Sequence, residues 1–228
     1  MEREFIQRRS ASLHQRDLTK PARDGQRVFV AVPLPGPLKE EIGAWSDELR
    51  ILYPFRKWTD AADLHITLQF IGDTLPERVS ELRSVLASAA QSGAIRPFVL
   101  TLSGTGTFGI PERPKVFWAG IGGDREGLHQ ARNIVAEAVS ALGFKAEERA
   151  YSPHLTIARN YRGTEPFRMP RLQLRPGASD AGNSKGTEGR PADCSSASMS
   201  WTVDEVVLYR THMHRLPMYE TVARFPFG

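Results

Sequence analysis

The segment "DLHITLQF" (63–70) has a near copy later in the chain, "SPHLTIAR" (152–159). Each copy carries a histidine and, two residues later, a threonine, and apolar residues lie between and after them. Because side chains alternate along a β-strand, this pattern predicts one apolar face and one face that offers imidazole and hydroxyl. We therefore expect two strands whose polar faces meet in one cleft if the strands lie side by side or in facing sheets.

Alternation assigns each side chain of the two strands to a face. The polar faces are predicted to hold His65, Thr67 and Gln69 in the first strand, and His154 and Thr156 in the second. The apolar faces are predicted to hold Ile66, Leu68 and Phe70, and Leu155 and Ile157. A single His-x-Thr tripeptide is more often a satisfied structural pair than a site, but a repeated one is more specific.

Two imidazoles and two hydroxyls suit phosphoryl chemistry without a metal. A neutral imidazole can accept a proton from an attacking water, and a protonated one can give a proton to the departing oxygen. The threonine hydroxyls can donate hydrogen bonds to phosphate oxygens. No cofactor is needed for this reaction, and we expect none.

Composition excludes several classes of protein. With a single cysteine, Cys194, among 228 residues, no intramolecular disulfide can form. No apolar run approaches the roughly 18 residues of a membrane-spanning helix. The formal net charge of +4 favours polyanionic partners, although such an excess is weak evidence alone. We expect a cytoplasmic protein.

Strand and helix patterns alternate along the chain and predict an α+β fold. Apolar spacings of three and four residues predict helices in the segments 38–52, 79–89 and 128–142. Thr74 and Glu77 are predicted to form a capping box for the second helix, and Asp124 to cap the third. Strands are expected at 27–32, 98–103, 115–121, 203–210 and 219–225, with a Gly-rich turn at 104–114.

Two segments stand outside this pattern. Residues 1–26 are rich in arginine but also contain acids and lack an apolar core, so they are neither a secretory signal nor a typical transit peptide, and we expect a disordered leader. Residues 175–200 contain no aromatic residue and no Leu, Ile or Val, which predicts a flexible insertion. Residues 27–228 are then expected to form one two-lobed domain.

At the two His-x-Thr strands the sequence resembles the two-histidine (2H) phosphoesterases, and within them the RNA 2′,3′-cyclic phosphodiesterase branch, also called 2′-5′ RNA ligase-like proteins. The flanking segments "RVFVAVPLP", "GTGTFGIPERPKVFWAGI" and "VDEVVLYRT" resemble the same group. The resemblance covers about 27–170 and 201–227. It implies two pseudo-symmetric lobes with antiparallel sheets lining a central cleft and helices outside.

The resemblance also implies a function. It implies metal-independent opening of a 2′,3′-cyclic phosphate at an RNA 3′ end, or on a nucleotide, to a 2′-phosphomonoester by a monomeric enzyme. His65 and His154 would be the acid–base pair, with Thr67 and Thr156 as ligands of the phosphate oxygens. Our first assignment makes His65 the acid and His154 the base, an order that the sequence does not fix. Arg159 would hold the phosphate or the polynucleotide.

Alternative interpretations remain open at several positions. Phe108 could stack on a terminal base, or it could be a packing residue of the core or of a loop. Trp118 is expected in the core, and Arg27 is expected on the surface. The other histidines offer at most a zinc site, for which no HxxxH or CxxC motif exists: His14, His129, His212 and His214. Two other functions compete with hydrolysis, namely 2′-5′ RNA ligation of tRNA halves and non-catalytic binding of RNA ends.

Overall fold

Within residues 25–145, 147, 149–174 and 199–228, which the computed structural model describes, nine strands form one antiparallel sheet. The strand order is β7-β4-β5-β6-β3-β1-β8-β9, and β2 pairs with the outer part of β6. The elements are β1 (Gln26–Pro33), α1 (Gly36–Leu52), β2 (Phe55–Trp58), a 3₁₀ turn η1 (Ala61–Asp63), β3 (His65–Thr74), α2 (Pro76–Gln91), β4 (Phe98–Ile110), β5 (Arg113–Gly123), α3 (Arg125–Ala141), β6 (His154–Tyr161), β7 (Ser200–Val203), β8 (Glu205–Thr211) and β9 (Tyr219–Pro226).

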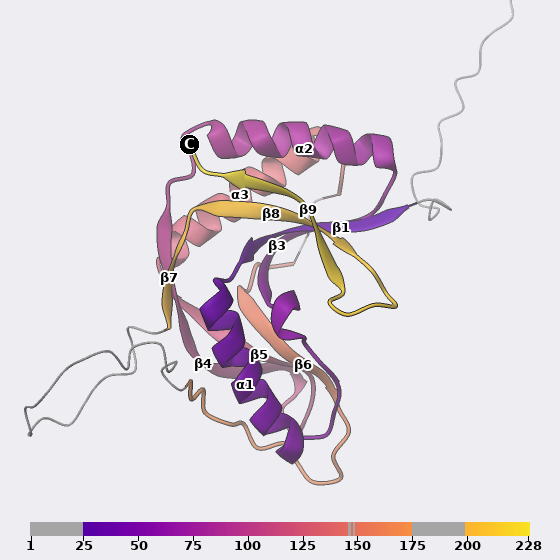
Figure 1. Cartoon of the computed structure of the whole chain (residues 1–228), viewed down its shortest axis with the longest axis vertical. Helices are drawn as coiled ribbons and strands as arrows, with labels where there is room; N and C mark the ends of the chain where they lie inside the picture. The colour runs from indigo at the N-terminus through magenta and orange to yellow at the C-terminus, as the bar shows by residue number, and fades with distance from the viewer. Residues whose placement is uncertain (1–24, 146, 148, 175–198) are drawn as a thin grey trace, which may run out of the picture.

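The sheet consists of two halves that meet between β3 and β6. A single residue pair, Ile66 with Leu155, links these two strands. Helices α2 and α3 lie along the half that contains β1, β8 and β9, whereas α1 lies along the half that contains β4, β5 and β6 (Figure 1). The predicted two-lobed α+β fold is confirmed, with one correction: the two expected sheets are halves of one hydrogen-bonded sheet.

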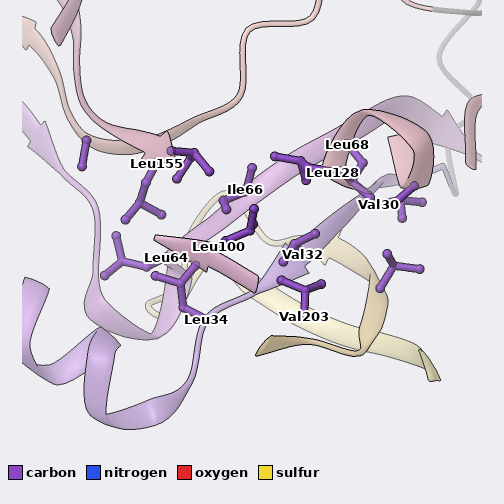
Figure 2. Close-up of a cluster of buried hydrophobic side chains, with 14 of the residues drawn as sticks. Val30, Val32, Leu34, Leu64, Ile66, Leu68, Leu100, Leu128, Leu155 and Val203 are labelled. Carbon is purple, nitrogen blue, oxygen red and sulfur yellow. The ribbon is translucent and has the colours of Figure 1, made fainter. Parts of the chain in front are cut away.

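One large hydrophobic core extends through both halves. Figure 2 shows part of it, where side chains of β1, β3, β4, β6, β7 and α3 gather: Val30, Val32, Ile66, Leu68, Leu100, Leu155, Val203 and Leu128. Trp45 of α1 reaches the same core and lies 6.0 Å from the ring of Phe117 in β5. Because this core is continuous, it fixes the two halves relative to each other.

Strand β1 is buried on both of its faces. Alternate residues Val28, Val30 and Val32 belong to the large core. Phe29 and Ala31 point to the opposite face, where they form a small second cluster with Val207 and Tyr209 of β8. The side chains that β1 and β8 place on the sheet face opposite the large core therefore form a second apolar patch.

The predicted alternation of β3 is correct only as far as Leu68. Beyond it Gln69 is 1% exposed and Phe70 is 58% exposed, the reverse of the expectation. The cause is the irregular pairing of β3 with β1. The register of this pairing shifts between Val28 and Phe29 and again between Val30 and Ala31. A bulge inserts an extra residue and exchanges the faces of the side chains that follow. Phe70 thus lies on the face of the small cluster, with its ring 6.0 Å from that of Phe29.

The helix starts agree with one prediction and contradict another. Asp124 caps α3 as expected, because its carboxylate accepts a hydrogen bond from the Gly127 N–H at 2.8 Å. The capping box of Thr74 is wrong: Leu75 occupies the N-cap position, no side chain caps α2, and the Thr74 hydroxyl donates to the carbonyl of Gly72. Pro76 at the first position of α2 has no N–H, so this helix start has one unsatisfied donor fewer.

The remaining differences concern element boundaries. The expected Gly-rich turn is largely strand, since β4 continues to Ile110 and pairs with β5 up to Arg113. Strand β2 was not predicted. The leader and the insertion lie outside the described residues, apart from their edges: β1 already begins at Gln26, and Met199 and Ser200 belong to the described part. In the part of the chain that is described, no helix has both the length and the apolar character needed to cross a membrane.

Candidate active site

The two His-x-Thr pairs face each other across the junction between β3 and β6. Since the strands are antiparallel and Ile66 pairs with Leu155, the register sets His65 opposite Thr156 and Thr67 opposite His154. Each histidine therefore has the threonine of the other motif as its neighbour across the strands. The four side chains are partly exposed, while Ile66 and Leu155 are fully buried on the other face.

Both imidazoles are held by the same backbone contact. Nδ1 of His65 lies 2.7 Å from the carbonyl oxygen of Asp63, and Nδ1 of His154 lies 2.8 Å from that of Ser152. A carbonyl can only accept a hydrogen bond, so Nδ1 must carry the hydrogen in each ring. Nε2 is then the nitrogen that can accept a proton in the neutral ring or donate one in the charged ring.

The threonine hydroxyls lie within reach of groups that can act on a phosphate. The Thr67 hydroxyl is 3.1 Å from Nε2 of His65. The Thr156 hydroxyl accepts a hydrogen bond of 3.4 Å from the guanidinium of Arg159. These contacts gather proton carriers, hydroxyl donors and one cation within a few residues of the strand junction.

A pocket at this junction contains part of the set. Its lining includes His65, Thr156 and Arg159 together with residues of the segment from β2 to η1 and of the β8–β9 hairpin with the start of β9: Lys57, Trp58, Thr59, Asp60, Asp63, Leu216, Met218 and Tyr219. Lys57 is paired with Arg159 across β2 and β6, so two cations stand side by side at the pocket. An anion such as phosphate fits this lining, because cations and hydroxyls can satisfy its oxygens.

Aromatic rings surround each histidine. The ring of Phe108 stands edge-on to His154 at 4.8 Å, and the ring of Trp118 lies 6.4 Å from it. Trp118 is only partly buried, so the expectation that it belongs to the core is wrong. Its ring lies over Gly106, where an added Cβ would come within 2.2 Å of it. On the other side, Phe29 lies 4.8 Å from His65.

Asp63 connects His65 to the hairpin between β8 and β9. Its carboxylate is 4% exposed and accepts hydrogen bonds from the N–H groups of Met218 at 2.8 Å and Tyr219 at 2.9 Å. Tyr219 in turn packs edge-on against the His65 ring at 5.0 Å. One residue thus orients the imidazole through its carbonyl and fixes the neighbouring tyrosine through its side chain. No sequence pattern indicates this contact, which joins segments more than 150 positions apart.

Burial favours the neutral form of both histidines in the ligand-free protein. Desolvation, followed by the positive charges of Lys39, Arg159 and protonated His154, lowers the pKa of His65 to about 4. Desolvation and then Arg159 also lower the pKa of His154. Burial raises the pKa of Tyr219, so that its phenol remains a hydrogen-bond donor.

The other candidate residues lie away from the junction. Arg27 is exposed and pairs with Asp73, as expected for a surface charge. His129 packs edge-on against Tyr151 at 5.3 Å, and His212 contacts Glu220 at 2.5 Å. His14 and Cys194 lie outside the described residues. Among the residues that are described, no three His, Cys, Asp or Glu side chains are grouped closely enough to hold a metal ion.

Comparison with known proteins gives consistent results. Residues 35–215 match the family described as the 2′-5′ RNA ligase superfamily. The chain is 38% identical over 198 residues to an RNA 2′,3′-cyclic phosphodiesterase of Geobacillus stearothermophilus, an alignment that covers 87% of this chain. It is 27% identical over 199 residues to the protein of the same name from Bacillus subtilis (strain 168), which covers 86% of this chain and 94% of that protein.

A solved structure has the same fold. The crystal structure of E. coli LigT complexed with 3′-AMP superposes with a TM-score of 0.66 at 24% identity, and the match covers 90% of this chain and 99% of that one. The lengths of the relatives differ, because this chain spans only 56% of the Geobacillus protein.

Proposed function

The chain belongs to the 2′-5′ RNA ligase superfamily, and from this membership we propose that it is an RNA 2′,3′-cyclic phosphodiesterase. The proposed substrate is an RNA 3′ end, or a nucleotide, that carries a 2′,3′-cyclic phosphate, and the product is a 2′-phosphomonoester. The names of the relatives from Geobacillus stearothermophilus and Bacillus subtilis support this activity.

The duplicated histidine geometry carries the proposal. Two imidazoles, each with its Nδ1 hydrogen fixed by a carbonyl two residues earlier, face the threonine of the other motif across β3 and β6. The proposed reaction takes a proton from water on one side of phosphorus and gives a proton to the leaving oxygen on the other side. It therefore needs two such groups. A protein that only binds a phosphate has no such need.

The proposed step balances with these residues alone. One neutral imidazole accepts a proton from water as the water oxygen bonds to phosphorus, the bond from phosphorus to O3′ breaks, and the second imidazole gives O3′ its proton. The hydroxyls of Thr67 and Thr156 donate to the non-bridging oxygens, and Arg159 offsets their charge. If a ribose 5′-hydroxyl replaces water as the nucleophile, the same two proton transfers form a 2′-5′ phosphodiester and release O3′, which is how the ligase alternative uses the same groups.

The two histidines take different roles in this step. Burial lowers the pKa of both imidazoles, so each ring can start the reaction in the neutral form that accepts a proton. We propose His65 as the acid that protonates O3′ and His154 as the base that activates water.

The activity is tested with an oligoribonucleotide that ends in a 2′,3′-cyclic phosphate, incubated in EDTA. We expect a 2′-phosphate product, and we expect His65→Ala or His154→Ala to lower kcat by about 10²–10⁴-fold, the usual worth of one positioned proton-transfer group. Absence of product from the wild-type protein, or undiminished product from both variants, would contradict the proposal. Ligation that outpaces hydrolysis at matched substrate would favour the ligase, and tight binding without turnover would favour an end-binding module.

The order of roles has its own test. In a substrate with sulfur in place of O3′, the thiolate departs without a proton, so the loss of the acid should matter little. We expect His65→Ala to recover most of its activity on this substrate and His154→Ala to stay impaired. The opposite pattern would make His154 the acid.

Two further expectations concern the setting of the enzyme. We propose that it acts as a monomer, because both His-x-Thr pairs come from one chain. We also propose a cytoplasmic location, for which the single cysteine is the supporting observation. Size-exclusion chromatography with light scattering, and fractionation of cells, test the two expectations.

A further inference from the structure

We propose that a second site, a basic surface hollow at the far end of β2, β5 and β6, binds the phosphate backbone of the RNA on the 5′ side of the reacting end. The inference deepens the proposed function and rests on it. It makes an oligoribonucleotide, rather than a mononucleotide, the preferred substrate. We call this site the basic hollow, and it is lined by Arg56, Arg113, Pro114, Lys115, Asn160, Tyr161 and Arg162.

The lining of the basic hollow is positively charged, and no acidic residue of the lining balances this charge. Four of its seven residues are cations, all four are exposed, and no carboxylate lines it. The nearest acids along the chain are Glu112 and Glu165, and neither is part of the lining. Within the described part of the chain, none of the four cations forms an ion pair, whereas several arginines elsewhere do: Arg27, Arg50, Arg78, Arg210, Arg215 and Arg224.

Three separate strand segments bring these cations together. Arg56 comes from β2, Arg113 and Lys115 from β5, and Arg162 from the residue directly after β6. Like charges placed side by side repel each other and raise the free energy of the folded state unless an anion occupies the space between them. The arrangement therefore indicates a polyanionic ligand.

The basic hollow and the catalytic pocket share strands β2 and β6. Strand β6 carries Thr156 and Arg159 in the lining of the pocket and leads directly to Arg162 in the lining of the basic hollow. At about 3.3 Å per residue, the path from His154 to Arg162 is about 26 Å long. Lys57 of the pocket lining directly follows Arg56 of the basic hollow in β2, so cations of the two sites are neighbours along both strands.

This arrangement favours RNA over other polyanions. A strand whose 3′-terminal phosphate lies at the histidines must leave the cleft, and its remaining phosphates recur at regular intervals along the exit. Evenly placed cations suit such a backbone and read no base sequence. An acidic peptide or an anionic membrane would have no reason to lie in line with the two histidines.

The test compares a long and a short substrate. One is an oligoribonucleotide of about ten nucleotides, a length within the usual range of single-strand sites, with a 2′,3′-cyclic phosphate at its 3′ end. The other is a mononucleotide 2′,3′-cyclic phosphate. The variant neutralises the basic hollow with four substitutions: Arg56→Gln, Arg113→Gln, Lys115→Gln and Arg162→Gln. The matched control removes the same charge from exposed positions outside both sites: Arg83→Gln, Arg96→Gln, Arg125→Gln and Arg149→Gln.

We expect the basic-hollow variant to lose about tenfold or more in kcat/KM for the oligoribonucleotide and to keep its kcat/KM for the mononucleotide. The slope of log(kcat/KM) against log[salt] should become shallower by about 0.7 for each lost phosphate contact. The control should keep the wild-type preference. Equal losses on both substrates, an unchanged salt slope, or an equal effect of the control would overturn the inference.

A binding measurement tests this inference independently of the proposed catalytic function. Fluorescence anisotropy with the same oligoribonucleotide bearing a 3′-phosphate needs no turnover, so it remains informative if neither substrate is hydrolysed. We expect the basic-hollow variant to bind it more weakly than the control does. Equal affinity for the RNA, combined with loss of binding to an acidic peptide or to phosphatidylserine vesicles, would assign the surface to that other partner and reject RNA.

Discussion

At the residue scale, Asp63 performs two tasks with two different groups. Its carbonyl accepts the Nδ1 hydrogen of His65, and its carboxylate accepts two backbone N–H groups from the β8–β9 hairpin. The first contact sets the tautomer of the imidazole, and the second places Tyr219 against the ring. Asp63 is therefore a positioning residue, which acts on the reaction through His65.

Asp63→Asn should separate these tasks, because it keeps the carbonyl and alters only the side chain. An amide has one oxygen, so one of the two buried N–H groups loses its acceptor. We expect the free energy of unfolding to fall by about 1–3 kcal/mol and kcat to fall more than KM changes. Urea denaturation and steady-state kinetics measure both effects. Asp124→Asn is the matched control, since asparagine also serves as a cap where Asp124 accepts from the Gly127 N–H outside the pocket, and a comparable loss there would contradict the role of Asp63.

The buried His65 makes stability depend on pH. Its pKa is lowered from 6.5 to about 4 on folding, so between these values the unfolded chain binds more protons than the folded one. The free energy of unfolding should therefore fall as the pH decreases from about 6.5 to 4, by at most about 3 kcal/mol from this group, and should not change through His65 above that window. Urea denaturation across this range should show a shallower dependence for His65→Gln, whereas His154→Gln should retain the contribution of His65.

The faces of the His-x-Thr pairs could be predicted because alternation is a local property of a strand. The partners of His65 could not, since Phe29, Asp63 and Tyr219 come from three separate segments. The position of Trp118 was missed for a related reason. Its place on the polar face depends on Gly106 of the neighbouring strand, which leaves room for the ring.

At the scale of elements, the irregular pairing of β3 divides one strand into two parts. Before it, the even-numbered Ile66 and Leu68 point into the core, and after it the even-numbered Phe70 points out. A sequence pattern with period two contains no signal for an inserted residue, so the prediction was wrong from Gln69 onward. The Gly-rich segment was taken for a turn for a similar reason, because glycine is typical of turns and gives no indication of the partner strand that keeps β4 extended.

Substitutions on the two sides of this bulge should differ in cost, although regular alternation would place Leu68 and Phe70 on the same buried face. Leu68→Ala should cost about 2–5 kcal/mol, because Leu68 is 3% exposed in the large core. Phe70→Ala should cost less than about 1 kcal/mol, because its ring is mostly exposed. Thermal denaturation of the two variants measures the difference, and equal losses would indicate that β3 alternates regularly after all.

At the scale of the whole molecule, the two halves share little hydrogen bonding but one hydrophobic core. One residue pair joins β3 to β6, while the large core contains side chains from both halves. The resemblance of the flanking segments predicted two lobes correctly. It did not predict that they form a single sheet, because one residue pair from distant segments, Ile66 with Leu155, joins β3 to β6 and leaves no pattern in the sequence.

The shared core should make the halves unfold together. We expect a single transition in urea, with coincident midpoints when it is followed by far-ultraviolet circular dichroism and by tryptophan fluorescence. Ile66→Ala should lower the midpoint without splitting the transition. Two resolved transitions in the wild-type protein would show that the halves are independently stable.

The hydrogen bonds from Met218 and Tyr219 to Asp63 have a consequence for synthesis. Strand β9 is made long after β3, yet it completes the wall of the pocket at which β3 presents His65. A nascent chain therefore exposes both His-x-Thr strands before their surroundings exist. Until β9 has left the ribosome, His65 lacks its tyrosine neighbour and Asp63 lacks its two donors, so the proposed phosphodiesterase activity should appear late and abruptly during translation.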